Sequence, residues 1–204
     1  MRKYRKQFFS VLSCLVVISL IYSKFPGSEA KCEEVKSEKS AIHQVVQHLK
    51  NKQVKLGHKD LQVVANTIWK ESQYHNVDYR LVLALIEVES NYRHDVISPD
   101  GSKGFMQLKP STARAVAREA DMSYNGSSDL VDPRKNIQIG VYFLSKMINE
   151  FKSIRKALYA YNVGPNRAKK RIARLPNNNK EPHSRFTRRV MLAFQNNMST
   201  FPAF

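Results

Sequence analysis

Apolar residues recur three and four positions apart along most of the chain after residue 60, which is the spacing of an amphipathic helix. No segment alternates apolar and polar residues convincingly, as a half-buried strand would. The segments with helical spacing are Leu61–His75, Asp78–Asn91, Ser111–Ala120, Pro133–Phe151, Ile154–Asn162, Asn166–Leu175 and His183–Asn197. The pattern therefore predicts an all-α domain.

Turn-forming residues separate these predicted helices. Residues 98–101 read Ser-Pro-Asp-Gly, which is typical of a turn. Asp132 is predicted to cap a helix whose first turn contains Pro133, and Gly164-Pro165 is predicted to end one helix before the next begins. The breaks and the periodicity therefore agree.

The N-terminus has the order of a secretory signal. Basic residues follow Met1, an apolar run of fifteen residues extends over 8–22, and the small residues Ser28 and Ala30 follow. The run is long for a cleavable signal and shorter than the roughly 20 residues of a spanning helix, although we favour cleavage. Residues 1–30 are therefore predicted to be a signal peptide or an N-terminal membrane anchor, and the protein to be exported to the periplasm or cell envelope.

Residues 31–60 are rich in Lys, Glu, Ser, Gln and His, and their bulky apolar residues gather between Ile42 and Leu49. This composition predicts a polar stem with one short helix. The folded domain is then expected over residues 61–204.

The chain is strongly basic, with 34 Lys and Arg against 17 Asp and Glu and a net charge of +17. Nucleic acid, anionic lipid and the carboxylate-bearing bacterial wall would all attract it, and the predicted export favours the envelope over nucleic acid. The histidines are scattered, and neither H-E-x-x-H nor a paired-cysteine motif occurs. We expect no metal, no cofactor and a monomeric protein.

One acidic residue lies on an apolar helix face. In an ideal helix over this region, Leu81, Leu85 and Val88 share one side, and Glu89 falls within their stripe, whereas Glu87 points the opposite way. A carboxyl among apolar side chains loses hydration, so its pKa rises and it can act as a general acid near neutrality. The alternative from position alone is an ion pair with Arg or Lys across the core.

Three segments carry a family resemblance: A-L-I-E-V-E-S-N-Y over 84–92, S-P-D-G-S-K-G-F-M-Q-L-K-P over 98–110, and A-Y-N-V-G-P over 160–165. In order and spacing they resemble the soluble lytic transglycosylase family, over about residues 61–200. The resemblance implies a compact lysozyme-like helical domain with a substrate cleft, and Glu89 as its catalytic acid and base. The residues that it implies to bind substrate are Ser90, Ser98, Met106, Gln107, Tyr161 and Asn162.

The sequence departs from the family pattern at three positions. Phe105 replaces a usual Leu, Val163 replaces Ala, and Lys109 stands where a Met commonly touches the sugar. A cation at position 109 puts that sugar subsite in doubt and would instead suit a peptide carboxylate.

The resemblance implies cleavage of the β-1,4 bond between MurNAc and GlcNAc of peptidoglycan, with formation of a 1,6-anhydroMurNAc end. Substrate groups would replace the second carboxylate of ordinary glycosidases. The remaining candidate acids lie in predicted turns or loops, where capping or solvation is the commoner role: Asp95, Asp100, Asp129 and Asp132. Two alternatives stay open, a lysozyme-type muramidase and a non-catalytic wall-binding component of an envelope-spanning assembly.

Overall fold

The computed structural model describes residues 27–175, 181–182 and 184–203, so the apolar run over 8–22 lies outside the described residues. The described chain is helical and forms two isolated β-bridges, Ile97 with Lys103 and Lys103 with Leu108. The helices are α2 Gly27–Asn51, α3 His58–Tyr74, α4 Tyr79–Ser90, α5 Pro110–Glu119, the 3₁₀ helix η1 Ser127–Leu130, α6 Pro133–Phe151, α7 Ile154–Val163, α8 Pro165–Ala173 and α9 Arg185–Thr200. The predicted all-α class is confirmed.

The chain divides into two compact units, Met1–Ser40 and Ala41–Phe204. The first unit is described only from Gly27 onward, as helix. Within the described residues, none of the helices combines the length and apolar character that crossing a bilayer requires. The second unit contains the hydrophobic core and the candidate site.

The region expected to be a polar stem differs from that expectation. Helix α2 continues to Asn51, and its residues from Ala41 onward belong to the second unit. Three of these residues, Ala41, Val45 and Leu49, are buried. They are spaced four residues apart, so they lie on one face of the helix and form an apolar stripe. The compact unit thus begins at Ala41, before the expected boundary at residue 61.

Side-chain caps define several helix starts. Asp132 Oδ1 accepts hydrogen bonds from the backbone N–H groups of Arg134 at 2.8 Å and Lys135 at 3.2 Å, as expected before a first-turn proline. Ser184 Oγ accepts from Thr187 N at 3.3 Å, so α9 begins at Arg185. Most predicted boundaries therefore move by only a few residues.

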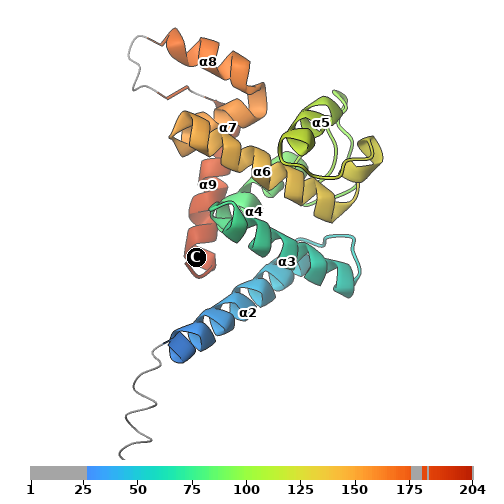
Figure 1. Cartoon of the computed structure of the whole chain (residues 1–204), viewed down its shortest axis with the longest axis vertical. Coiled ribbons are helices and arrows are strands. Elements are labelled where there is room, and N and C mark those ends of the chain that lie inside the picture. The colour runs from blue at the N-terminus through green and yellow to red at the C-terminus, as the bar shows by residue number, and fades with distance from the viewer. Residues whose placement is uncertain (1–26, 176–180, 183, 204) are drawn as a thin grey trace, which may run out of the picture. The chain divides into compact units, whose positions relative to one another are not determined.

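Helix α4 lies at the centre of the second unit, packed against α9 and α3 (Figure 1). Its residues from Leu81 to Ile86 are all buried, so this helix is apolar on every side over that stretch. Its last turn carries Glu89, and the core that encloses α4 thereby sets where that carboxyl lies.

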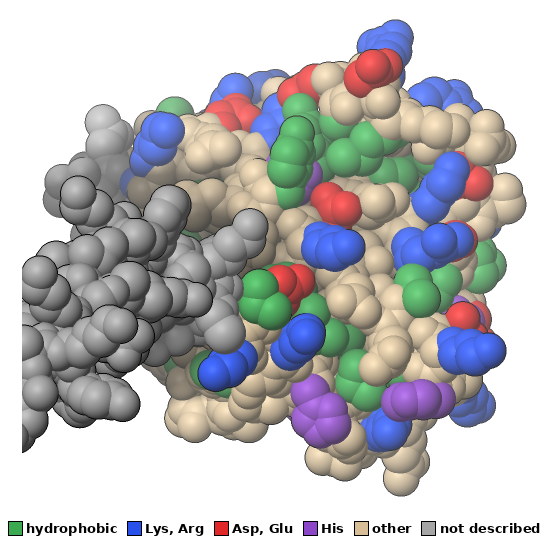
Figure 2. Space-filling view, turned by 60° about the horizontal axis from the view of Figure 1, so that its bottom comes forward, with side chains coloured by type: hydrophobic (Ala, Val, Ile, Leu, Met, Phe, Trp, Pro, Cys, Tyr) green, Lys and Arg blue, Asp and Glu red, His purple; other side chains and the backbone are tan. Residues whose placement is uncertain are grey.

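One face of the protein is mixed in charge. Figure 2 shows one face on which Lys and Arg side chains are spread among apolar and acidic ones instead of forming one block. Several cations are ion-paired in the second unit, for example Lys52 with Glu87 at 2.9 Å and Lys135 with Asp129 at 2.9 Å. Such exposed pairs add little stability, so the excess positive charge matters mainly for attracting acidic partners.

Candidate functional site

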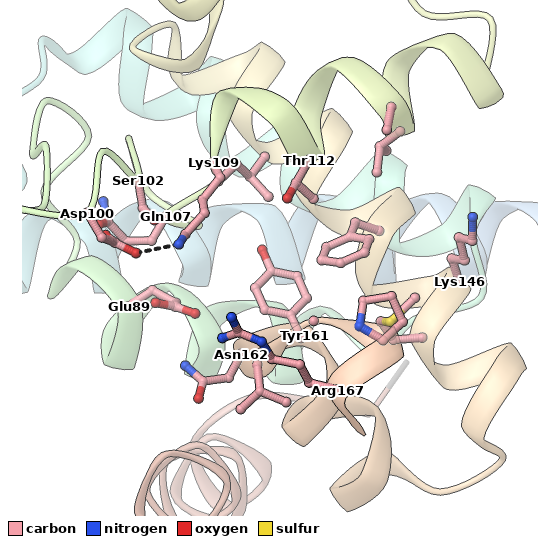
Figure 3. A pocket seen from close by; sticks show the side chains of 18 of the residues that line it. Glu89, Asp100, Ser102, Gln107, Lys109, Thr112, Lys146, Tyr161, Asn162 and Arg167 are labelled. Carbon is pink, nitrogen blue, oxygen red and sulfur yellow. Dashed lines mark ion pairs between the residues drawn. The ribbon is translucent and has the colours of Figure 1, made fainter. Parts of the chain in front are cut away.

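A cleft of about 710 Å³ is lined by side chains from α4, α5, α6, α7 and α8 and from the loop over residues 100–109. Four of the predicted site residues line it: Glu89, Gln107, Tyr161 and Asn162. Figure 3 shows Glu89 on one side of the cleft, with Tyr161 and Asn162 beside it and the loop above. These residues are far apart in sequence and meet through the helix packing.

Glu89 has the surroundings of a group that keeps its proton. Burial, reinforced by the negative charge of Asp100, raises its pKa from 4.5 to about 8, while the positive charge of Arg189 acts in the opposite direction. Glu87 lies elsewhere and binds Lys52 Nζ. The Glu89 carboxyl is therefore mostly protonated at neutral pH and available as an acid.

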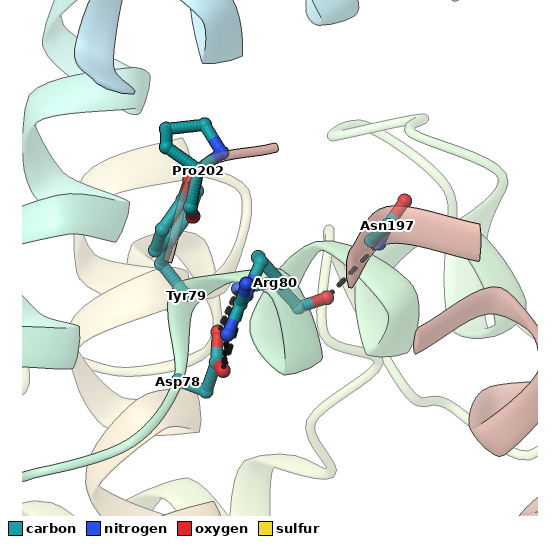
Figure 4. A network of polar contacts seen from close by, with 5 residues as sticks. All are labelled: Asp78, Tyr79, Arg80, Asn197 and Pro202. Carbon is teal, nitrogen blue, oxygen red and sulfur yellow. Dashed lines mark hydrogen bonds and ion pairs between the residues drawn. The ribbon is translucent and has the colours of Figure 1, made fainter. Parts of the chain in front are cut away.

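Helix α4 is held at its start by polar contacts to the end of the chain (Figure 4). Tyr79 Oη donates to the carbonyl of Pro202 at 3.0 Å, and Asn197 Nδ2 donates to the carbonyl of Arg80 at 2.9 Å. The Arg80 guanidinium donates to the carboxylate of Asp78, which also caps the helix. These bonds fix α4 against α9, and so fix Glu89 relative to the rest of the cleft.

Buried Asn136 of α6 holds the loop that forms the cleft's upper edge. Its Oδ1 accepts from Met106 N at 2.8 Å, and its Nδ2 donates to the carbonyls of Lys103 at 2.9 Å and Leu130 at 3.0 Å. All three partners are backbone groups, so one side chain fixes the loop and the 3₁₀ helix together. The sequence motifs gave no sign of this residue.

Glycine is required where this loop approaches α6. Gly104 has a φ of 75°, and a Cβ there would overlap the Leu130 carbonyl and the Asn136 amide. The Met106 side chain packs equally closely on Gly140, because a Cβ at Gly140 would overlap the Met106 sulfur. The motif's Gly and Met therefore pack the loop onto α6.

Gln107 lines the cleft and also braces the loop. Its backbone has a φ of 46°, and its Nε2 donates to the carbonyls of Gly104 at 2.9 Å and Val96 at 3.3 Å. The amide is therefore held in one orientation, which suits a group that positions a ligand.

Tyr161 is buried at the base of the cleft. Its Oη donates to the carbonyl of Met106 at 2.9 Å, and its ring lies 5.0 Å from that of Phe143. Burial, with the nearby Glu89 carboxylate as a smaller cause, raises the pKa of Tyr161 well above 10. The hydroxyl is thus neutral and already bound to the loop.

Three residues that the resemblance assigned to substrate binding do not line the cleft. Ser90 is 2% exposed and its Oγ donates to the carbonyl of Ile86 at 3.0 Å, while the Met106 side chain is fully buried. Ser98 Oγ donates to the Asp100 carboxylate and accepts from Ser102 N at 3.0 Å. Ser90 and Met106 pack into the core and Ser98 shapes the turn, and a substrate-binding role for these three residues stays a prediction.

A second carboxylate, Asp100, lines the cleft, whereas the sequence suggested only a turn residue. Lys109 Nζ lies 2.9 Å from its Oδ2. Hydrogen bonds from Ser98 and then Lys109 hold the pKa of Asp100 well below its usual value, so it is ionised. The sequence marked Lys109 only as a departure from the family pattern, and the carboxylate that it meets here is one of the protein itself.

The other polar residues of the cleft that the sequence did not single out are Ser102, Thr112, Glu119, Lys146 and Arg167. Among the residues that the structure describes, no group of three or more His, Cys, Asp or Glu side chains is arranged to hold a metal ion. The cleft offers a proton donor, Glu89, and polar binding groups.

Comparison with known proteins gives similar relatives over part of the chain. A transglycosylase of Enterobacteria phage PRD1 is 32% identical over 102 residues, which is 50% of this chain and 35% of that protein. The membrane-bound lytic murein transglycosylase F of Vibrio cholerae serotype O1 is 38% identical over 94 residues, 43% of this chain and 16% of that protein. The aligned part of the chain thus spans about a third or less of these relatives.

A solved structure shares the fold. The 70 kDa soluble lytic transglycosylase of Escherichia coli matches with a TM-score of 0.60 at 21% identity, covering 75% of this chain and 29% of that one. The family described as Transglycosylase SLT domain matches residues 66–184, more than half of the chain, and this match includes every segment that lines the cleft. The chain belongs to the transglycosylase SLT domain family.

Proposed function

We propose that this chain is a peptidoglycan lytic transglycosylase that cleaves the β-1,4 bond between MurNAc and GlcNAc and leaves a 1,6-anhydroMurNAc end. The observation that carries the proposal is Glu89, whose carboxyl is half-buried in the cleft with a pKa of about 8. Relatives named as lytic murein transglycosylases support the choice of substrate.

In the proposed reaction Glu89 first donates its proton to the glycosidic oxygen, and the bond from that oxygen to C1 of MurNAc breaks. The N-acetyl group of the same sugar shields the developing positive charge. The Glu89 carboxylate then takes the proton of the C6 hydroxyl while the oxygen of that hydroxyl bonds to C1. The acid is thereby regenerated, and no water is consumed. Gln107, Tyr161 and Asn162 border Glu89 in the cleft and would orient the sugar.

Asp100 is the observation that favours a second candidate, a muramidase that hydrolyses the same bond. Inverting and retaining glycosidases use a second carboxylate to activate water or to attack the sugar. Asp100 is ionised and lines the cleft, but Ser98 and Lys109 occupy its carboxylate. We therefore favour the transglycosylase.

Digestion of purified sacculi separates the candidates. Mass spectrometry of the released fragments should show anhydroMurNAc ends, and the Glu89→Gln variant, which retains shape but has no acid, should release none. Reducing MurNAc ends would establish the muramidase, and equal release by the variant would exclude Glu89 as the acid. A purified protein that binds sacculi but releases nothing would support the non-catalytic wall-binding role.

We also propose that the protein acts in the cell envelope, because the basic and apolar order of residues 1–30 is that of an export signal or anchor. The relatives include some named as membrane-bound and others named as soluble. Fractionation of cells that express the full chain, followed by carbonate extraction, distinguishes a released periplasmic protein from an anchored one.

A further inference from the structure

One cation of the cleft has no acidic partner among the residues that the structure describes. The ionisable residues of the cleft other than Tyr161 are Glu89, Asp100, Glu119, Lys109, Lys146 and Arg167. Lys109 pairs with Asp100, and Lys146 pairs with Glu119. Arg167 forms no ion pair with any acidic side chain that the structure describes.

The position of Arg167 is set by the start of α8. Gly164 has a φ of 88° and ends α7, Pro165 occupies the first turn of α8, and Ala168 is buried beneath the helix. Arg167 lies between these anchors and is exposed. Figure 3 shows its side chain extending from α8 into the cleft toward Tyr161 and Asn162.

The charge of the cleft follows from these pairs. With Glu89 protonated, the two carboxylates balance the two lysines, and Arg167 leaves a surplus of one positive charge. The field of Arg189, which lowers the pKa of Glu89, has the same sign. An uncharged glycan would leave the Arg167 guanidinium without a matching group, whereas a carboxylate accepts two of its hydrogen bonds in parallel.

We propose that Arg167 is a specificity-determining residue that binds a carboxylate attached to the muramic acid residue of the bound strand. The inference rests on the proposed function, because it assumes that the glycan occupies this cleft. In intact wall the carboxylate belongs to the stem peptide, and in a strand stripped of peptide it is the lactyl group itself. Both present the same chemistry to a guanidinium.

Binding measurements on an inactive background test this without turnover. The proteins are Glu89→Gln and Glu89→Gln with Arg167→Gln, and the ligands are peptide-bearing glycan fragments, peptide-free fragments with a free lactyl carboxylate, and uncharged GlcNAc oligomers of equal length. Calorimetry should show that loss of Arg167 weakens binding of the carboxylate-bearing fragments about tenfold at low salt, and leaves the uncharged oligomers unchanged. The charged fragment whose affinity falls more on loss of Arg167 identifies the source of the carboxylate.

Arg171, one turn further along α8, is the matched control. It is exposed and does not line the cleft. On the same background Arg171→Gln removes the same overall charge and should change no affinity by more than about twofold. Equal losses for charged and uncharged ligands, equal effects of the two substitutions, or no effect of Arg167→Gln would each overturn the proposal.

The outcomes are independent of the test of the proposed function. If Glu89→Gln still cleaved sacculi, the chemical assignment would fail while the ligand comparison, repeated with any inactive variant, would still report on Arg167. If the chemistry held and the ligand comparison showed no charge selectivity, only the role of Arg167 would be lost.

Discussion

Replacing Glu89 by glutamine should stabilise the protein at neutral pH. The carboxyl is held where its ionised form is disfavoured, so the fold opposes a charge that the unfolded chain carries freely. The neutral amide has nearly the same shape and no such charge. A group positioned for proton donation thereby lowers the free energy of unfolding.

The size of the effect follows from the two pKa values, 4.5 for the unfolded chain and about 8 in the fold. Below pH 4.5 both states bind the proton and there is no penalty. Between the two values the unfolded chain releases the proton while the fold keeps it, so stability falls as pH rises, by at most about 1.4 kcal/mol per unit. At pH 7 the full difference is about 3 kcal/mol, and solvent screening in an open cleft reduces it to about 2 kcal/mol.

Urea unfolding at pH 5, 6, 7 and 8 measures the effect. The difference in unfolding free energy between Glu89→Gln and the wild type should grow steadily across this range. Glu150→Gln is the control, because the Glu150 carboxylate pairs with Lys169 outside the cleft, and the difference between this variant and the wild type should not grow from pH 5 to 8. A constant difference between Glu89→Gln and the wild type from pH 5 to 8 would show that Glu89 ionises normally, and would refute its assignment as a protonated acid.

Three further predictions concern the same site. The kcat on soluble glycan fragments should fall tenfold per pH unit above about pH 8, because Glu89 must be protonated to act; a pH profile from 6 to 10 measures this limb. Asn136→Ala leaves the buried Met106 N–H and Leu130 carbonyl without a partner, while the Lys103 carbonyl keeps Leu108 N, and should lower stability by about 2–5 kcal/mol, seen as a fall in Tm of roughly 10 °C. Tyr161→Phe keeps the ring but removes its hydrogen bond to Met106, and should lower the unfolding free energy in urea by about 1–3 kcal/mol.

Most of the helices could be predicted from the sequence because they bury one regular apolar stripe. The exception is instructive: Ala41, Val45 and Leu49 form a complete stripe, yet they lie in a stretch rich in charged residues. The sequence indicated a short helix there, but the polar composition of residues 31–60 led us to expect a stem and not part of the folded unit. Whether such a stripe is buried depends on distant residues that pack on it, which local composition does not reveal.

Site residues were predictable where the geometry of a helix sets their positions, and less so where contacts across the loop set them. The separation of Glu89 from Glu87 follows from two steps of about 100° along α4. The same geometry turns Ser90 away from the cleft, although it adjoins Glu89 in the motif. Asn136 and Lys109 act through bonds across the loop, and no sequence spacing predicts those contacts.

The carboxylate of Asp100 is consistent with a mechanism in which Glu89 is the single acid. Hydrogen bonds from Ser98 and Lys109 keep Asp100 ionised, so its negative charge is present throughout the pH range in which Glu89 holds its proton. That charge raises the pKa of Glu89. The lysine stabilises the ionised aspartate, and the aspartate in turn favours the protonated glutamate. In the proposed reaction Asp100 would therefore act through the protonation of Glu89, so that one proton donor suffices.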